Sequence, residues 1–338
     1  MQSISAKNLR KLLLKFILLD GEAALNYFIE WEKQIIYDDL DFQSFKLLSA
    51  VYPKLLKNNF QSRLFSRIKS AYRRTWAENQ LLLNYLNELF SILNTAEIKF
   101  IIADENIRIP EIYSDFGIFS LQNFSIITPL SSKNYVCQKL SENDWGICGE
   151  EIGQMQVFKN KSLHIKVLWI SDEVFSIHLK NVERVLVKAK LQPIMCREEQ
   201  ILNLCTNELL MVNGGESRWQ FIVSALFKYQ KINANRLVEL ARRKHLAHQL
   251  AKMLQKLTDD FGIGIPVNLI DDLKKSPKVG KIALISQKIQ NLRQSYQLFS
   301  KYEKISFLEF LAERWKRDSY KALFKHVLQS GRRLLQTK

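Results

Sequence analysis

Acidic side chains lie around two short apolar runs, residues 98–102 and 124–127, and in the connector between them. The acids that could take part in metal chemistry here are Asp104, Glu105 and Asp115. Phosphate chemistry assisted by Mg²⁺ needs carboxylates that hold the ion from one side, for example two aspartates spaced two apart on a strand. Asp104, Glu105 and Asp115 do not form such an alternating pair, so the residues alone do not show a complete metal site.

A basic stretch without any acid lies between Pro53 and Trp76. Aromatic and aliphatic residues interleave with its cations at helical spacing, which predicts an amphipathic helix. The cations that could bind a polyanion are Arg63, Arg67, Arg73 and Arg74. Two interpretations follow: a solvated basic face on a packing helix, or a docking surface for an acidic partner or a nucleic acid.

A second basic amphipathic segment is predicted over residues 305–335. Trp315, Tyr320 and Phe324 form its apolar side. The candidate binding residues on its basic side are Arg314, Lys316, Arg317 and Lys321. A helix that packs by its aromatic side and leaves the cations in water explains the same pattern, and binding to an anionic membrane surface is a third interpretation.

The composition is that of a soluble globular protein with a large positive charge. The 338 residues contain 47% hydrophobic residues, and 50 Lys and Arg against 34 Asp and Glu give a net charge of +16. That surplus favours a polyanionic partner, either an acidic protein or nucleic acid. Four cysteines without metal-ligand spacing indicate free thiols. With no signal peptide or membrane-spanning run apparent, we expect a cytoplasmic protein.

Hydrophobic patterning predicts an α+β fold with a small mixed-sheet core between helical regions. The core combines a leucine-rich helix at 79–94, strands at 98–103 and 124–128, and a hairpin of residues 154–158 and 163–169. We place the domain boundaries as follows: an N-terminal helical region 1–76, the core 77–172, a helical domain 173–275 and a basic helical tail 276–338. Residues 173–275 are expected to be helical throughout.

The order of these elements resembles the uncharacterised nucleotidyltransferase family, a branch of the DNA-polymerase-beta-like nucleotidyltransferases. The framework residues that carry the resemblance are Ala96-Glu97-Ile98-Lys99-Phe100-Ile101-Ile102, Tyr113-Ser114-Asp115-Phe116-Gly117 and Phe124-Ser125-Ile126-Ile127. Later segments are similar to the family's helical half: residues 196–204, 219–222 and 232–243. The resemblance implies a nucleotidyltransferase-like fold.

The family's working residues are replaced in this chain. Where the family has Lys-Gly, this sequence has Ala103-Asp104, and the family's arginine falls on Phe119. The two family aspartates fall on Asn123 and Ser125, and the third carboxylate falls on Lys166. The resemblance therefore implies the fold with a degenerate active site.

We therefore expect a catalytically inactive protein that acts as a binding or assembly partner through its basic helices, without a metal or cofactor. One alternative is a nucleic-acid-binding protein that uses the same helices. Another is a divergent Mg²⁺-dependent nucleotidyltransferase in which Asp104, Glu105 or Asp115 holds the metal and a nucleotide binds. The identity of the partner and the oligomeric state are open at this point.

Overall fold

The computed structural model describes residues 6–37, 40–121, 124–148, 154–160, 163–210 and 216–277. The chain divides into two units after Lys278. The predicted basic helix at 305–335, with Arg314, Lys316, Arg317 and Lys321, lies outside the described residues. The architecture below is that of the first unit.

The N-terminal region is helical, as its apolar periodicity predicts. It consists of α1 (Ala6–Leu18), α2 (Glu22–Gln34) and α3 (Phe42–Lys57). The rings of Phe16 and Phe28 lie 4.9 Å apart, and Trp31 follows at 5.5 Å from Phe28. These aromatic contacts form one part of a core that α1, α2 and α3 share with the later helices.

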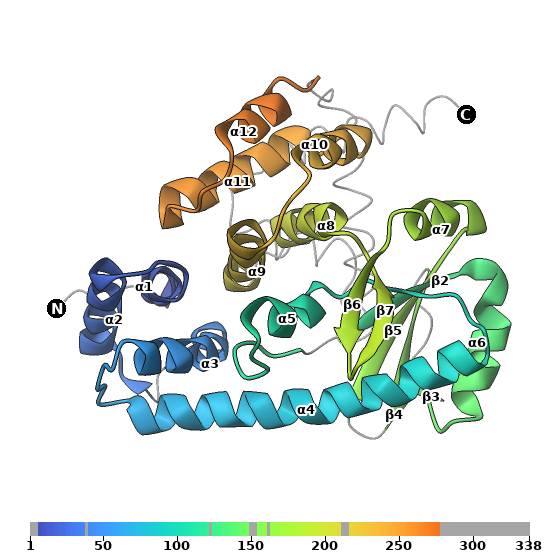
Figure 1. Ribbon diagram of the computed structural model, residues 1–338, viewed down its shortest axis with the longest axis horizontal. Coiled ribbons are helices and arrows are strands. Elements are labelled where there is room, and N and C mark those ends of the chain that lie inside the picture. Colours follow the sequence, from blue (N-terminus) through green and yellow to red (C-terminus); the bar gives the residue numbers. More distant parts are fainter. Residues whose placement is uncertain are drawn as a thin grey trace, which may run out of the picture. The chain divides into compact units, whose positions relative to one another are not determined.

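One long helix, α4 (Phe65–Thr95), belongs to two hydrophobic cores (Figure 1). Near its start, Ile68 and Ala71 pack with α1–α3, while its second half packs against the sheet through Leu83, Leu86, Leu89, Phe90 and Leu93. The sequence predicts two separate helices here, an amphipathic helix in the basic stretch between Pro53 and Trp76 and a leucine-rich helix over 79–94, with a domain boundary after residue 76. The helix instead runs across that position, because no glycine or proline interrupts residues 65–95.

The strands form a single mixed sheet in the order β3-β4-β5-β2-β1-β7-β6. They are β1 (Ile101–Ile102), β2 (Ser125–Pro129), β3 (Gly146–Ile147), β4 (Met155–Asn160), β5 (Leu163–Ile170), β6 (Glu183–Val187) and β7 (Lys190–Ile194). Strand β2 runs antiparallel to β1 and parallel to β5, and β4–β5 is the predicted hairpin. The two strands predicted around the connector are confirmed, although β1 is shorter than expected.

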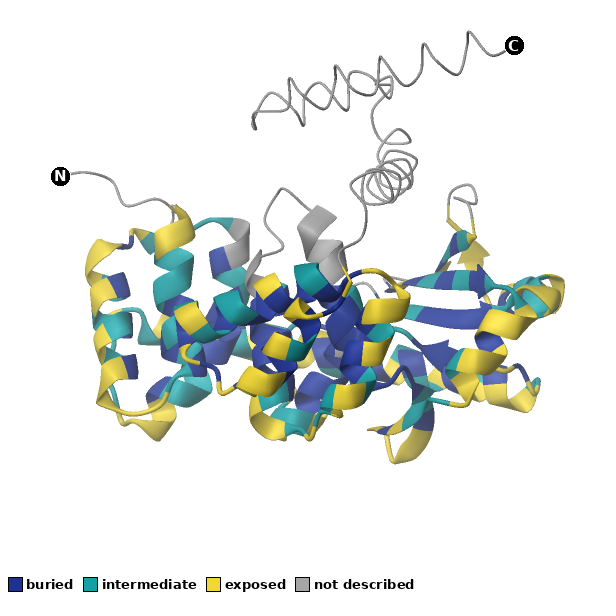
Figure 2. Ribbon diagram, turned by 90° about the horizontal axis from the view of Figure 1, so that it is seen from above, coloured by how far each residue is buried: buried dark blue, intermediate teal, exposed yellow. Residues whose placement is uncertain are grey.

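Helices cover both faces of the sheet. On one face, α4 and α6 (Lys133–Ser141) pack on Ile126, Val167 and their neighbours. On the other face, Phe175 from α7 (Asp172–Leu179) packs on Ile101 and Ile127. In Figure 2, the dark blue parts of the strand arrows are these buried residues.

The expectation that residues 173–275 are entirely helical is wrong, because β6 and β7 form a hairpin that joins the sheet through β1. Val185 and Val187 are buried, and the intervening Leu186 is exposed, which is strand alternation. The turn consists of Lys188 and Ala189, with φ of 46° and 64°. Such turns usually carry asparagine and glycine, so this sequence lacks the usual hairpin signal.

The remaining helices follow this hairpin: α8 (Arg197–Leu210), α9 (Glu216–Tyr229), α10 (Ala234–Arg243), α11 (Ala247–Phe261) and α12 (Val267–Lys274). Their buried faces complete the core that begins with α1–α3. Among the described helices, none combines the length and apolar character needed to cross a membrane.

The connector between β1 and β2 contains a short 3-10 helix (Glu105–Arg108) and α5 (Ile109–Tyr113) and is held by α4. The Asn79 side chain, 2% exposed, donates to the carbonyl oxygens of Phe116 and Phe119, each at 2.7 Å. Its Oδ1 accepts from the Leu121 amide at 3.0 Å. One buried amide side chain thus satisfies three backbone groups of the connector.

The Lys188–Ala189 turn should gain stability from residues that suit positive φ. Replacing the pair by Asn-Gly (Lys188→Asn with Ala189→Gly) should raise the free energy of unfolding by about 1 kcal/mol, because side chains that resist the left-handed region are removed. Urea unfolding of the variant and the parent measures this. An unchanged or lower value would contradict the strain assigned to the turn.

Asn79→Ala should lower the free energy of unfolding by about 3 kcal/mol, because three backbone groups lose their partner. Asn84→Ala is the matched control, since Asn84 lies on the exposed side of the same helix. We expect the control to change stability by less than about 0.5 kcal/mol. Equal effects of the two variants in urea unfolding would refute the role of the buried amide.

Candidate functional site

Three positions that the resemblance assigns to chemistry lie side by side on one face of the sheet. The Ala103 amide donates to the Ser125 carbonyl at 3.0 Å, and Ser125 is in register with Lys166 on the parallel strand β5. Each is two residues from a member of the core under α7, namely Ile101, Ile127 and Leu168. Residues two apart on a strand share a face, so Ala103, Ser125 and Lys166 form one row. The row presents a methyl group, a hydroxyl and an ammonium.

Lys166 is partly desolvated on this face. Burial lowers the pKa of its ammonium, the positive charge of Arg218 in α9 lowers the pKa further, and the carboxylate of Asp104 opposes both effects. Arg218 likewise lowers the pKa of Lys46 in α3, where desolvation is again the main cause. The row therefore holds a partly buried ammonium, whose own charge is unfavourable for a divalent cation.

Two of the acids considered as metal ligands, Asp104 and Asp115, have structural partners. Asp104 is buried, and its side chain accepts from the Asn106 amide at 2.8 Å, which caps the 3-10 helix. Asp115 accepts from the Tyr72 hydroxyl at 2.9 Å and from the Gly117 amide at 2.7 Å. Glu105 begins the 3-10 helix. Within the described ranges, no three His, Cys, Asp or Glu side chains gather as a metal site would require.

Two further positions of the expected active site lie apart from the row or outside the described residues. Phe119 is buried in the core of the helical region, where its ring stacks on Phe221 with centroids 5.0 Å apart. Its position therefore serves packing. Asn123 falls outside the described residues.

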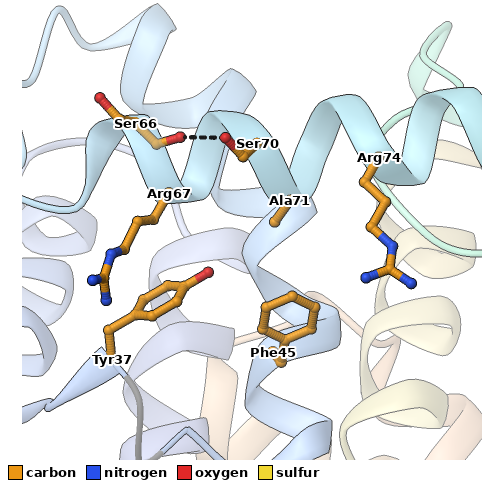
Figure 3. A pocket seen from close by; sticks show the side chains of 7 residues that line it. All are labelled: Tyr37, Phe45, Ser66, Arg67, Ser70, Ala71 and Arg74. Carbon is orange, nitrogen blue, oxygen red and sulfur yellow. Dashed lines mark hydrogen bonds between the residues drawn. The ribbon is translucent and has the colours of Figure 1, made fainter.

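A pocket of about 350 Å³ lies against the basic side of α4. Arg67 and Arg74, seven residues apart, extend from the same side of the helix, and Tyr37 and Phe45 lie between them (Figure 3). The Arg67 guanidinium lies 4.5 Å from the centroid of the Tyr37 ring, a cation–π contact that orients it. Arg74 also pairs with Glu78 at 2.8 Å on the exposed surface. The pocket combines two cations with an apolar wall.

The structure separates Arg63 and Arg73 from this pocket. Arg63 precedes α4 and donates to the carbonyl oxygens of Glu32 and Ile35, the latter at 3.0 Å, where it satisfies the end of α2. Arg73 is exposed but does not line the pocket. Of the four basic candidates in this region, Arg67 and Arg74 are the two that the structure brings together.

The aromatic walls of the pocket are not apparent in the sequence. Tyr37 follows α2, and Phe45 lies in α3. Their spacing from each other and from the arginines follows no motif. The packing of α3 against α4 brings Phe45 to this helix, and the segment after α2 places Tyr37 beside Arg67.

No protein-family model and no curated protein matches this chain. Among solved structures, the chain is similar to an antigenic nucleotidyltransferase-like protein from Paracoccidioides brasiliensis. The sequence identity is 9%, the TM-score is 0.37, and the match covers 60% of this chain and 95% of that one. Function is therefore inferred below from the residues of this chain.

Lys166→Met should stabilise the protein at neutral pH, because it removes a charge whose pKa is lowered by burial. The pKa of Lys166 in the folded protein lies below its value in the unfolded chain. The wild type therefore gains stability as pH rises from the folded toward the unfolded pKa. The gain is at most about 1.4 kcal/mol per pH unit. The advantage of the variant should therefore shrink between pH 7 and pH 10. Urea unfolding at several pH values measures it.

Lys159→Met is the matched control, since Lys159 is exposed on the neighbouring strand β4. It removes the same charge from an exposed position, so comparison of the two variants over the same pH range isolates the effect of burial. A stability difference for Lys166→Met that stays constant over this range would contradict the desolvated state of that ammonium.

Proposed function

We propose that this chain is a catalytically inactive protein with a nucleotidyltransferase-like fold, which docks an acidic segment of a protein partner against α4. The observation that carries the proposal is the pocket in which Arg67 and Arg74 flank the apolar wall of Tyr37 and Phe45. Cations beside an aromatic surface are suited to a short peptide that carries both carboxylates and apolar side chains.

The row of Ala103, Ser125 and Lys166 supports the absence of catalysis. Metal-assisted nucleotidyl transfer relies on carboxylates that neutralise the charge developing on phosphate oxygens. At this row, a methyl group, a hydroxyl and a partly buried ammonium stand in register. None of them supplies a negative charge to hold Mg²⁺.

The spacing of the two arginines favours a peptide. Seven residues of helix span about 10 Å, and an extended peptide covers about 10 Å in three residues. A Glu-x-x-Glu segment therefore matches Arg67 and Arg74, and the intervening residues can contact Phe45 and Ala71. Nucleic acid would require a longer track of cations, whereas Arg63 is bonded to the carbonyl oxygens at the end of α2.

A fluorescent peptide with the sequence Ser-Glu-Leu-Leu-Glu-Ser tests the proposal by anisotropy titration. Arg67→Glu and Arg74→Glu should each weaken binding about tenfold or more, because one carboxylate then meets a like charge. A peptide with adjacent glutamates has the same charge and should bind more weakly. The full-length protein is used throughout.

Arg243→Glu is the matched control, because Arg243 forms an exposed pair with Glu239 four residues away, like Arg74 with Glu78. It should leave binding unchanged. Tighter binding of a single-stranded 20-nucleotide DNA or RNA through the same arginines would establish the nucleic-acid function instead. Calorimetric binding of a nucleoside triphosphate that requires Mg²⁺ and is lost in Asp104→Ala would revive the transferase function.

A further inference from the structure

A second pocket, of about 560 Å³, lies where β6, the start of α8 and the start of α10 meet. It is separate from the α4 pocket and shares no residue with it. Its charged lining residues are Glu183, Arg197, Glu198, Lys231 and Arg236. The remaining residues are Ile232, Asn233, Ala234 and Asn235, from the segment that enters α10.

Both carboxylates of this pocket are already engaged by the protein. Glu183 binds the buried Arg108 at 3.0 Å, and it accepts from the backbone amide of Arg197 at 3.1 Å. The Arg197 guanidinium approaches the same carboxylate at 3.2 Å. Glu183 therefore holds β6 against α8 and the connector.

Glu198 has a similar structural role at the other side of the pocket. It accepts from the Asn233 amide at 2.8 Å, and the Arg236 Nε lies 4.0 Å from its second oxygen. The two carboxylates thus fix the frame of the pocket. Three cations, Arg197, Lys231 and Arg236, line the same space, so its net charge is positive.

Some hydrogen-bond donors that line this pocket are not used by the two carboxylates and could bind an anion. The Arg197 Nε–H is buried and has no hydrogen-bond acceptor among the described residues. Lys231 is an exposed lining residue, and it forms no ion pair within the described part of the chain. A further acceptor entering the pocket would satisfy groups that the protein itself leaves available.

The beginning of α10 adds backbone donors. The Asn233 side chain caps the helix by accepting from the Arg236 amide at 3.1 Å. The amides of Ala234 and Asn235 belong to the first turn, where no acceptor exists within the helix. The positive end of the helix dipole favours an anion at this position.

We propose that this pocket binds a phosphate group, either free or carried by a small molecule, with Lys231, Arg236 and the first-turn amides of α10 as its ligands. A divalent cation does not suit the site, because its lining is net positive and both carboxylates are engaged. A phosphate brings several acceptor oxygens, which match the donors of Lys231, Arg236 and the helix amides. This site is independent of the acidic-segment function proposed for α4.

Equilibrium dialysis with radiolabelled inorganic phosphate tests the proposal, at constant ionic strength set with chloride. We expect saturable binding of one phosphate per chain. Lys231→Ala and Arg236→Gln should each weaken it about tenfold, the change in affinity expected when one charge-assisted contact is lost. Lys252→Ala is the matched control, because Lys252 is a similarly exposed lysine on α11.

Amide NMR of the deuterated full-length protein locates the site. Phosphate should shift the amide resonances of Ala234 and Asn235, and Lys231→Ala should reduce those shifts at equal phosphate concentration. Titration with a phosphate monoester, ribose 5-phosphate, then distinguishes a free phosphate site from one that prefers a carried phosphate. Absence of saturable binding, or equal binding by Lys231→Ala and Lys252→Ala, would overturn the proposal.

Discussion

The hydrogen bonds of Asn79 connect the two halves of the described structure. They lie midway along α4, between the turns that pack with α1–α3 and those that pack on the sheet. The three backbone groups that they satisfy belong to the connector that leaves β1 and returns to β2. Because the same connector carries Phe119 into the helical core, this buried amide ties α4 to a segment that contacts both the sheet and that core.

Several of the lysines and arginines that contribute to the net charge of +16 have structural partners within the protein. Lys54 donates to carbonyl oxygens at the end of α1, and Lys228 donates to Leu18 at the same end. Burial lowers the pKa of Lys54 to about 8. Arg108 is buried between the connector, β6 and α8. Lysines and arginines that bind helix ends or form internal ion pairs are a weaker sign of nucleic-acid binding than the same number of cations on one exposed face.

The predictable parts of the fold are those whose signal is local. The helices of residues 6–57, the β4–β5 hairpin and the two strands around the connector follow from apolar periodicity alone. The β6–β7 hairpin escapes this reasoning because Lys188 and Ala189 replace the usual turn residues. Ser125 and Lys166 pair in register on β2 and β5, while their assignment as former active-site positions stays a prediction. By contrast, the two pockets gather residues far apart in sequence, and no spacing rule links Tyr37 to Arg67 or Glu183 to Arg236.

Gly117 has a consequence for how this sequence can change over time. A Cβ at this position would lie 2.2 Å from the Tyr72 ring, so no larger residue fits while the tyrosine is present. Tyr72 itself bonds Asp115, whose carboxylate also holds the Gly117 amide. Substitutions at these positions therefore have to occur in a fixed order. Tyr72 has to be replaced by a smaller residue before Gly117 can be replaced by a larger one. The three positions should drift as a group, so that the same exchange is harmful in one genetic background and neutral in another.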